Sequence, residues 1–238
     1  MGAQIEILAE TGSTNADLAA RVRAGERIAE GLWLLADRQS AGRGRQGREW
    51  FDGVGNFMGS TMVRLAPGDP PAPTLALVAG LAVWEAVSHA LATPAGLILK
   101  WPNDLLLGGA KLAGILLEGA EDAVIVGIGV NLASAPALPD RPAVALSALG
   151  PAPDRNSFAA TLAHAFAEEC ERWRRYGLAP LLVRWQSAAH PVGTPLTVQE
   201  PGAAPVQGTF AGLAADGALQ LRLADGSIRV VHAGDVFA

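Results

Sequence analysis

The spacing of apolar residues predicts both helices and strands in the first 190 residues of the chain. Apolar side chains recur every three or four residues, as on one face of a helix, in four stretches: 14–24, 74–91, 157–176 and 178–187. Short apolar runs typical of buried strands lie between them, at 5–8, 31–36, 56–65, 97–100, 105–107, 111–118 and 123–132. Thr14 is expected to cap the first helix, with Asp17 three residues later in a weak form of the capping box, and Gly25 is expected to end it.

A different pattern begins at Gly193. Four short runs there alternate apolar and polar residues, at 195–198, 206–213, 218–223 and 227–232. Turn-forming dipeptides separate the runs, and two of these are Asp-Gly, which is a strong hairpin signal between strands. The pattern predicts a small antiparallel barrel, so we expect one domain over residues 1–190 and a second over residues 191–238.

Lysine is scarce, since the chain has only Lys100 and Lys111. Lys111 begins an apolar run that follows a Gly-Gly pair, and this arrangement predicts a β-hairpin that brings Lys111 close to Asp104. A lysine in an apolar strand either faces water at the entrance of the strand or turns into a site. Asn103 and Asp104 follow a proline at the end of the preceding strand, where an ordinary turn is the competing interpretation.

Arginine and glycine are concentrated in one segment, residues 39–50, which we call the arginine loop. Its sequence, QSAGRGRQGREW, places three arginines within six residues, each beside a glycine, and ends in an indole. Glycine lets the backbone approach a ligand closely, arginine presents donors suited to phosphate or carboxylate oxygens, and an aromatic ring offers a stacking face to a purine. The segment is interpreted either as a loop that closes over an anionic, nucleotide-like ligand or as a solvated, RNA-binding Arg-Gly segment.

Composition narrows these alternatives. The formal net charge of −5 argues against general nucleic-acid binding, which usually needs a basic face, and favours a focused anion site in the arginine loop. The single cysteine, Cys170, excludes an intrachain disulfide and favours a reducing compartment. The N-terminus has no signal-peptide pattern, and the most apolar helical stretch, 74–91, contains Glu85 and His89. We therefore expect a packed core helix, no membrane span and a cytoplasmic protein.

Four motifs follow one another in an order that resembles the biotin–protein ligases. They are GRGRQGREW in the arginine loop, KWPND at 100–104, KLAGILLE at 111–118 and GIGVN at 127–131. The tripeptide Ser13-Thr14-Asn15 fits the same family, and the resemblance covers nearly the whole chain. It implies an α+β fold in which a mixed or antiparallel sheet is flanked by helices, as in biotin/lipoate ligase catalytic domains, with a small SH3-like β-barrel at the C-terminus.

The resemblance also implies an activity in two steps. Biotin and ATP form biotinyl-5′-AMP and pyrophosphate, and a lysine amine of an acceptor protein then displaces AMP. The implied acceptor is the biotin carboxyl carrier protein or domain of acetyl-CoA carboxylase or of a related carboxylase. Mg²⁺ is expected as well, because it usually binds through few carboxylates together with substrate phosphates. No covalent enzyme intermediate is required, which suits a sequence without an evident nucleophile–base pair.

Residues of this chain that match the family's motifs position by position are expected to have the same roles. The residues expected to bind biotin are Ser13, Thr14, Asn15, Gln39, Arg43, Gly44, Arg45, Lys111 and Gly114. The residues expected to bind ATP are Arg45, Gln46, Arg48, Trp50, Asn103 and Asn131, with Trp50 packed against adenine. The residues expected to act in catalysis are Lys111, Arg43 and Arg48. Lys111 is expected to bridge the biotin carboxyl group and the α-phosphate, while Asp104 either helps to hold Mg²⁺ or orients Lys111.

Three features distinguish this chain within the family. Gln46 stands where some members have a further arginine, and the loop at 133–146, which in the family folds over the adenylate, lacks aromatic residues. No room precedes Ile5 for the helix-turn-helix domain of members that also repress transcription, so we expect the ligase alone and no DNA binding. Exposed strand edges in this fold can pair, so a homodimer is also possible.

Three other functions stay open at this point. A lipoate–protein ligase shares the fold class and the chemistry, although KWPND and GRGRQG favour biotin. A non-catalytic protein that captures biotin or a nucleotide is disfavoured, because binding alone does not require both Lys111 and the arginines. An RNA-binding protein built on the arginine loop is disfavoured by the acidic balance and by the single basic cluster.

Overall fold

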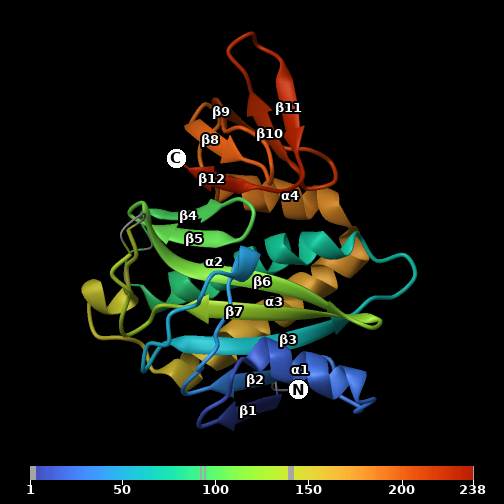
Figure 1. The fold of residues 1–238 in the computed structure, drawn as a ribbon, viewed down its shortest axis with the longest axis vertical. Coiled ribbons are helices and arrows are strands. Elements are labelled where there is room, and N and C mark those ends of the chain that lie inside the picture. Colours follow the sequence, from blue (N-terminus) through green and yellow to red (C-terminus); the bar gives the residue numbers. More distant parts are fainter. Residues whose placement is uncertain (1–3, 92, 94, 139–141, 238) are drawn as a thin grey trace.

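The structure is a computed structural model that describes residues 4–91, 93, 95–138 and 142–237. Residues 1–3 of the expected first domain, and residues 139–141 of the expected loop over the adenylate, lie outside the described residues. The strands form two sheets, one of seven strands and one of five. Figure 1 shows the seven-stranded sheet with its helices in the lower part of the molecule and the C-terminal sheet above it.

The larger sheet has the strand order β1-β2-β3-β7-β6-β5-β4. Its strands are β1 (Gln4–Leu8), β2 (Leu32–Ala36), β3 (Phe57–Arg64), β4 (Leu97–Lys100), β5 (Asp104–Leu107), β6 (Ala110–Ala120) and β7 (Ala123–Val130). The pair β1–β2 is parallel and the other neighbours are antiparallel, so the predicted mixed sheet is confirmed. Each strand falls within two residues of a predicted apolar run, because these runs are buried on at least one face.

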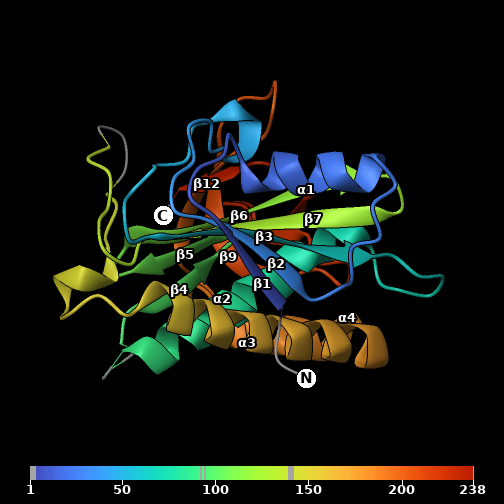
Figure 2. The same cartoon turned by 90° about the horizontal axis from the view of Figure 1, so that it is seen from below.

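Helices cover both faces of this sheet, as predicted. Figure 2 shows α1 (Thr14–Arg23) on one face and α2 (Leu75–Ala90), α3 (Arg155–Tyr176) and α4 (Leu178–Ser187) on the other. The helix α2 is buried along most of its length between the sheet and α3, which explains why its sequence is apolar on nearly all sides. Among the described residues, the stretch Ala72–Ala90 is long and apolar enough to cross a membrane, but its place beneath the sheet makes it a core helix, as expected.

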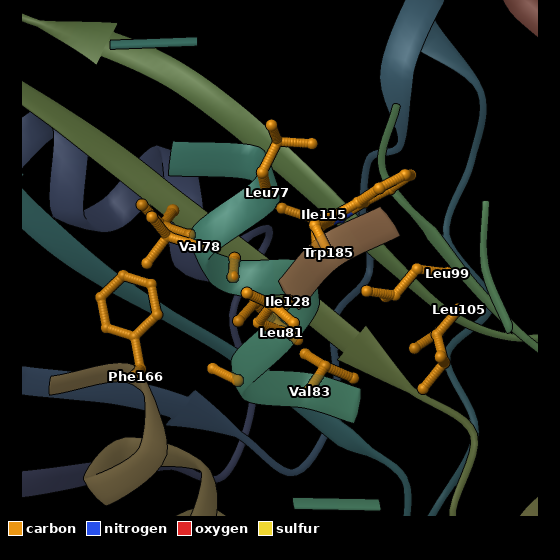
Figure 3. Packing of buried hydrophobic residues seen from close by; sticks show 14 of the residues in the cluster. Leu77, Val78, Leu81, Val83, Leu99, Leu105, Ile115, Ile128, Phe166 and Trp185 are labelled. Carbon is orange, nitrogen blue, oxygen red and sulfur yellow. The ribbon is translucent and has the colours of Figure 1, made fainter. Parts of the chain in front are cut away.

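The main hydrophobic core lies between the sheet and these helices. Figure 3 shows side chains of α2, among them Val78 and Leu81, in one cluster with Ile115 and Ile128 of β6 and β7 and with Phe166 of α3. This packing fixes β6 and β7, which occupy the centre of the sheet. Their opposite face is therefore presented toward α1 on a rigid support.

The C-terminal residues form the second sheet, in the order β11-β10-β9-β8-β12. Its strands are β8 (Pro195–Gln199), β9 (Val206–Leu213), β10 (Leu219–Arg222), β11 (Ile228–Val231) and β12 (Asp235–Phe237). The four predicted runs became strands, whereas β12 was not predicted. Since β11 and β12 are edge strands that do not pair with each other within the described residues, the sheet is open and is not the closed barrel that the sequence suggested.

The two sheets touch near the end of β4. The indole Nε1 of Trp101 donates a hydrogen bond of 3.1 Å to the carbonyl of Gly217 in the C-terminal sheet. In addition, Gln186 of α4 accepts a hydrogen bond of 3.0 Å from the backbone N–H of Leu213. The C-terminal sheet is therefore held beside the KWPND segment, close to the residues predicted to form the site.

Candidate functional site

A cavity of about 670 Å³ lies on the face of the larger sheet that α1 covers. Its lining combines the start of α1, the arginine loop, the end of β4, the middle of β6 and β7, and β12 of the C-terminal sheet. Every residue predicted to bind biotin or ATP lines this cavity except Gln46, and Asp104 lines it too. Gln46 is exposed at a one-turn 3₁₀ helix (Arg45–Gly47) with a φ of 56°, and its side chain is not among the lining groups.

The arginine loop folds back on itself at the mouth of the cavity. Its two arms pair at Arg43 and Glu49, and the backbone N–H of Trp50 donates 2.9 Å to the carbonyl of Gly42. Arg45 donates 3.2 Å to the side-chain oxygen of Asn103, and Arg48 forms a 2.9 Å ion pair with Asp235 of β12. Burial lowers the pKa of Arg45 from its ordinary value, but an arginine remains charged. The loop therefore carries cations that neighbouring elements already hold in place.

An irregularity in β6 aims Lys111 into the cavity. Leu105 of β5 pairs with Ala113, while the next residue, Leu106, pairs with Lys111, so Leu112 is an extra residue in β6. Side chains alternate along a strand, and without this bulge Lys111 would share the core-facing side of Ala113. The bulge moves Lys111 to the opposite face, where it lines the cavity. The interpretation of Lys111 as a residue turned into a site thus agrees with its position.

Both lysines of the chain meet at one carboxylate. The Nζ of Lys111 lies 2.6 Å from Oδ1 of Asp104, and the Nζ of Lys100 lies 3.7 Å from its Oδ2. The predicted approach of Lys111 to Asp104 across the hairpin is confirmed. Two ammonium groups around one carboxylate leave a net positive charge beside the arginine loop, which favours an anionic ligand.

The Trp50 ring lies against two glycines in the middle of the larger sheet. Gly114 and Gly129 are direct cross-strand partners in β6 and β7. A Cβ atom built on Gly129 would lie 2.2 Å from the Trp50 ring, and one on Gly114 would lie 2.9 Å from it. Glycine at both positions is therefore required for the indole to reach the sheet. The Lys111 ammonium lies 5.6 Å from the ring centroid, within the range of a cation–π contact.

The start of α1 contributes a buried polar cluster at the other end of the cavity. The backbone N–H of Thr14 donates 2.8 Å to Oε1 of Gln39, and the Thr14 hydroxyl lies 2.7 Å from that of Ser60 in β3. The Ser60 hydroxyl donates 2.6 Å to Oδ1 of Asn15. The prediction that Thr14 caps the helix is wrong: Ser13 is the N-cap residue, without a side-chain cap, and Thr14 uses its hydroxyl inside this cluster.

Two asparagines organise the side of the cavity that follows β7. Asn131 is 2% exposed, and its Nδ2 donates 3.2 Å to the carbonyl of Val144. Its Oδ1 is buried, and no hydrogen-bond partner for it occurs among the described residues. Asn56 accepts hydrogen bonds from the backbone N–H groups of Ala133 and Ser134, at 2.9 and 3.1 Å, and so fixes the start of the following loop.

Sequence reasoning missed several residues of this site. Ser60 and Asn56 carried a signal, because each is a polar residue within or beside an apolar strand and both are buried. Asp235 carried no sequence signal, since it contacts Arg48, which is 187 residues away in the sequence. Glu118, which accepts 2.7 Å from Asn15, is the last residue of the predicted run 111–118, and its position there gives no sign of this contact.

The acidic groups of the cavity do not form a metal centre by themselves. Within the described part of the chain, no three histidine, cysteine, aspartate or glutamate side chains lie close enough together to hold a metal ion. Asp104 is paired with two lysines, which compete with a cation for its oxygens. Its geometry fits the orientation of Lys111 better than the ligation of Mg²⁺.

Comparisons with known proteins give a consistent result. The Biotin/lipoate A/B protein ligase family matches residues 13–131, and the biotin protein ligase C terminal domain matches residues 193–238. A biotin–[acetyl-CoA-carboxylase] ligase of Paracoccus denitrificans is 41% identical, over 97% of this chain and 99% of the relative. One of Mycobacterium tuberculosis is 39% identical, over 98% of this chain and 88% of the relative.

Solved structures agree with the sequence relatives. The biotin protein ligase of Aquifex aeolicus in complex with biotin and ATP superposes with a TM-score of 0.85 at 26% identity. The match covers 98% of this chain and 97% of that one, so both sheets are shared.

Proposed function

Because the chain belongs to the biotin/lipoate A/B protein ligase family, we propose that it is an ATP-dependent biotin–protein ligase. It activates biotin as biotinyl-5′-AMP and transfers the biotinyl group to a lysine of the biotin carboxyl carrier of acetyl-CoA carboxylase. The observation that carries the proposal is that one cavity holds a neutral hydrogen-bonding cluster at one end and a cluster of fixed cations at the other. Biotin needs both, since it has a ureido ring at one end and a carboxylate at the other.

In the first step, a carboxylate oxygen of biotin attacks the α-phosphorus of ATP, and the bond from that phosphorus to pyrophosphate breaks. Two anions must approach each other, and negative charge then grows on the leaving group. We assign to Lys111, held by Asp104 at 2.6 Å, the contact with both the carboxylate and the α-phosphate. Arg45 and Arg48, already held by Asn103 and Asp235, supply further fixed positive charge.

In the second step, the amine nitrogen of the acceptor lysine attacks the acyl carbon of the adenylate. The bond from that carbon to the AMP oxygen breaks, and the amine releases a proton. Lys111 can stabilise charge on the same oxygens in this step as in the first. Arg43, which is exposed and also lines the cavity, would contact the ligand from the arginine loop.

The adenosine part belongs beside Trp50 and Asn131. The Trp50 ring supplies a stacking face, and the glycine patch keeps it close to the sheet. The Oδ1 of Asn131, which has no hydrogen-bond partner among the described residues, is an acceptor. It therefore suits a donor such as a ribose hydroxyl or the amino group of the base, and not a phosphate oxygen. The described parts of the following loop, 133–138 and 142–146, begin at the contact with Asn56 and would cover the nucleotide through aliphatic contacts.

We expect Mg²⁺ to arrive on the ATP phosphates, where it would neutralise the triphosphate. The protein offers it few ligands, because Asp104 is paired with lysines. We also propose that the catalytic domain spans residues 1–190 and the C-terminal domain residues 191–238, and that the protein is cytoplasmic. If two copies pair through the larger sheet, the β1 edge is the candidate, since the bridge between Leu99 and Ala189 covers part of the β4 edge.

The experiment that tests this function is exchange of labelled pyrophosphate into ATP, with biotin, with lipoate and without an acid. Exchange that depends on biotin alone is the expected result. Exchange with lipoate alone would identify lipoate, and not biotin, as the substrate and would leave the proposed mechanism unchanged. If the folded protein catalyses no exchange in the presence of Mg²⁺, the function is that of a binding protein without adenylation activity.

A further inference from the structure

A chain of hydrogen bonds leads from the cavity to Glu118, which is not one of the lining residues. The hydroxyls of Thr14 and Ser60 lie 2.7 Å apart, and the Ser60 hydroxyl donates 2.6 Å to Oδ1 of Asn15. The Nδ2 of Asn15 then donates 2.7 Å to Oε2 of Glu118 on β6. Thr14, Asn15 and Ser60 line the cavity, so Glu118 can reach a ligand only through them.

Glu118 determines which group donates and which accepts in each hydrogen bond of this series. A carboxylate only accepts hydrogen bonds, so it turns the amide nitrogen of Asn15 toward itself and leaves the amide oxygen facing Ser60. Ser60 has one hydroxyl proton, and Asn15 takes it. The Thr14 hydroxyl has two candidate acceptors, Oε1 of Gln39 at 3.2 Å and the Ser60 oxygen at 2.7 Å. The Ser60 oxygen is nearer and has no proton of its own left for this contact, so Thr14 donates to Ser60. Both hydroxyls then present only lone pairs to the cavity.

Two neighbouring contacts make the pattern complete. Oε1 of Gln39 accepts from the backbone N–H of Thr14 at 2.8 Å, which leaves the amide N–H groups of Gln39 as donors. Gly127 of β7 lets the Asn15 amide lie against the sheet, since a Cβ there would be 2.2 Å from Oδ1. This end of the cavity therefore offers acceptors from two hydroxyls and a donor from one amide. A cyclic urea has the complementary set, two N–H donors and one carbonyl acceptor.

We propose that Glu118 is a positioning residue that makes the cavity selective for the N–H groups of a ureido ring. It does so by fixing Asn15, and through Asn15 the proton directions of Ser60 and Thr14. The inference rests on the proposed function, because it takes biotin as the ligand. It adds a residue outside the cavity and a physical reason for selectivity at the ureido end.

The test is Glu118→Gln, which keeps the shape of the side chain but offers both a donor and an acceptor. The Asn15 amide can then turn over, and the hydroxyls no longer have to present lone pairs. In pyrophosphate exchange we expect the KM for biotin to rise about tenfold, the value for one charge-assisted hydrogen bond, with kcat and the KM for ATP close to wild type. Glu171→Gln, an exposed substitution of the same kind on α3, is the matched control.

A biotin analogue with one ureido nitrogen methylated separates positioning from a general loss of structure. Wild type should discriminate strongly against this analogue, and Glu118→Gln should discriminate clearly less. Glu118→Asp, which keeps an acceptor-only group, should restore the discrimination. Ser60→Ala interrupts the same chain and should reproduce the KM effect if Glu118→Gln does not fold.

Two results would overturn the inference. One is an unchanged KM for biotin and unchanged discrimination in Glu118→Gln beside normal wild-type exchange, which would remove the positioning role and leave the proposed function intact. The other is an equal rise in the KM for biotin and for ATP, which would indicate structural damage. Absence of biotin-dependent exchange in the wild type would instead remove the proposed function together with the inference.

Discussion

At the scale of single residues, the site depends most on Lys111. Its ammonium group is held between the Asp104 carboxylate at 2.6 Å and the Trp50 ring at 5.6 Å. A cation fixed before the substrates arrive stabilises developing charge without having to reorganise. Asp104 is 11% exposed in its side chain and also approaches Lys100, so the three groups form one charged unit inside the cavity.

We predict that Lys111→Ala abolishes most adenylate formation while the protein stays folded. The loss of one such contact typically lowers the rate about 10²- to 10³-fold. Pyrophosphate exchange measures the effect, and thermal unfolding checks the fold. Arg23→Ala, an exposed cation near the end of α1, serves as the control for loss of a positive charge. Normal exchange in Lys111→Ala would contradict the role given to this residue.

At the scale of elements, the loop that follows β7 is fixed by Asn56, the residue that precedes β3. Asn56 is 1% exposed and makes three hydrogen bonds to the start of this loop: two from backbone N–H groups, at 2.9 and 3.1 Å, and one to the carbonyl of Ser134, at 2.8 Å. Further along, Lys111 and Val144 pair through a backbone hydrogen bond of 3.0 Å, so the far side of the loop is attached to β6.

We predict that Asn56→Ala raises the KM for ATP more than the KM for biotin. The substitution leaves partly buried backbone groups of Ala133 and Ser134 without their partner, which costs up to about 1–3 kcal/mol and loosens the loop expected to cover the nucleotide. Steady-state exchange with each substrate varied in turn measures the two constants. Asn56→Asp keeps the two accepted hydrogen bonds and should be milder. Equal changes in both constants would indicate that the loop does not act on the nucleotide side.

The sequence predicted the helices and strands better than the local irregularities that orient individual side chains. The hairpin of β5 and β6 followed from its apolar runs and Gly-Gly turn, and it correctly placed Lys111 near Asp104. The bulge at Leu112 did not follow, because a bulge depends on pairing with another strand. The misplaced cap at Thr14 has a similar cause, since its hydroxyl is used by Ser60, which is distant in sequence. The strand β12 is three residues long and pairs with β8, a strand 40 residues earlier in the chain, so no local pattern predicts it.

At the scale of the whole molecule, the C-terminal sheet completes the site. Asp235 and its two neighbours in β12 line the cavity, and Asp235 holds Arg48 at 2.9 Å. The segment between the two sheets contains His190, which lies among apolar side chains including Trp101 and Val236. The Nε2 of His190 is buried, and no hydrogen-bond partner for it occurs in the described parts of the chain.

We predict that His190 makes the protein less stable as the pH falls. Burial, with a smaller contribution from Lys100, lowers the pKa of His190 below its ordinary value of 6.5. Below about pH 6.5 the unfolded chain therefore binds this proton more readily than the folded protein, and the free energy of unfolding decreases. The melting temperature of His190→Gln should fall less than that of wild type between pH 7 and pH 5.

The exposed His164 on α3 provides the matched control for this pH experiment. His164→Gln should retain the wild-type dependence of melting temperature on pH. An identical dependence in His190→Gln and wild type would show that the interface between the two sheets does not sense this proton.

The most direct test of the central claim is transfer of biotin to an acceptor in a single turnover. The protein is loaded with biotin and ATP, separated from excess ATP and mixed with a biotin carboxyl carrier domain, whose mass is then measured. We predict that the carrier gains one biotinyl group, that a carrier with its target lysine replaced by arginine gains none, and that protein carrying Lys111→Ala transfers almost none. A carrier that stays unmodified by the loaded wild-type protein would contradict the claim that this cavity performs both steps.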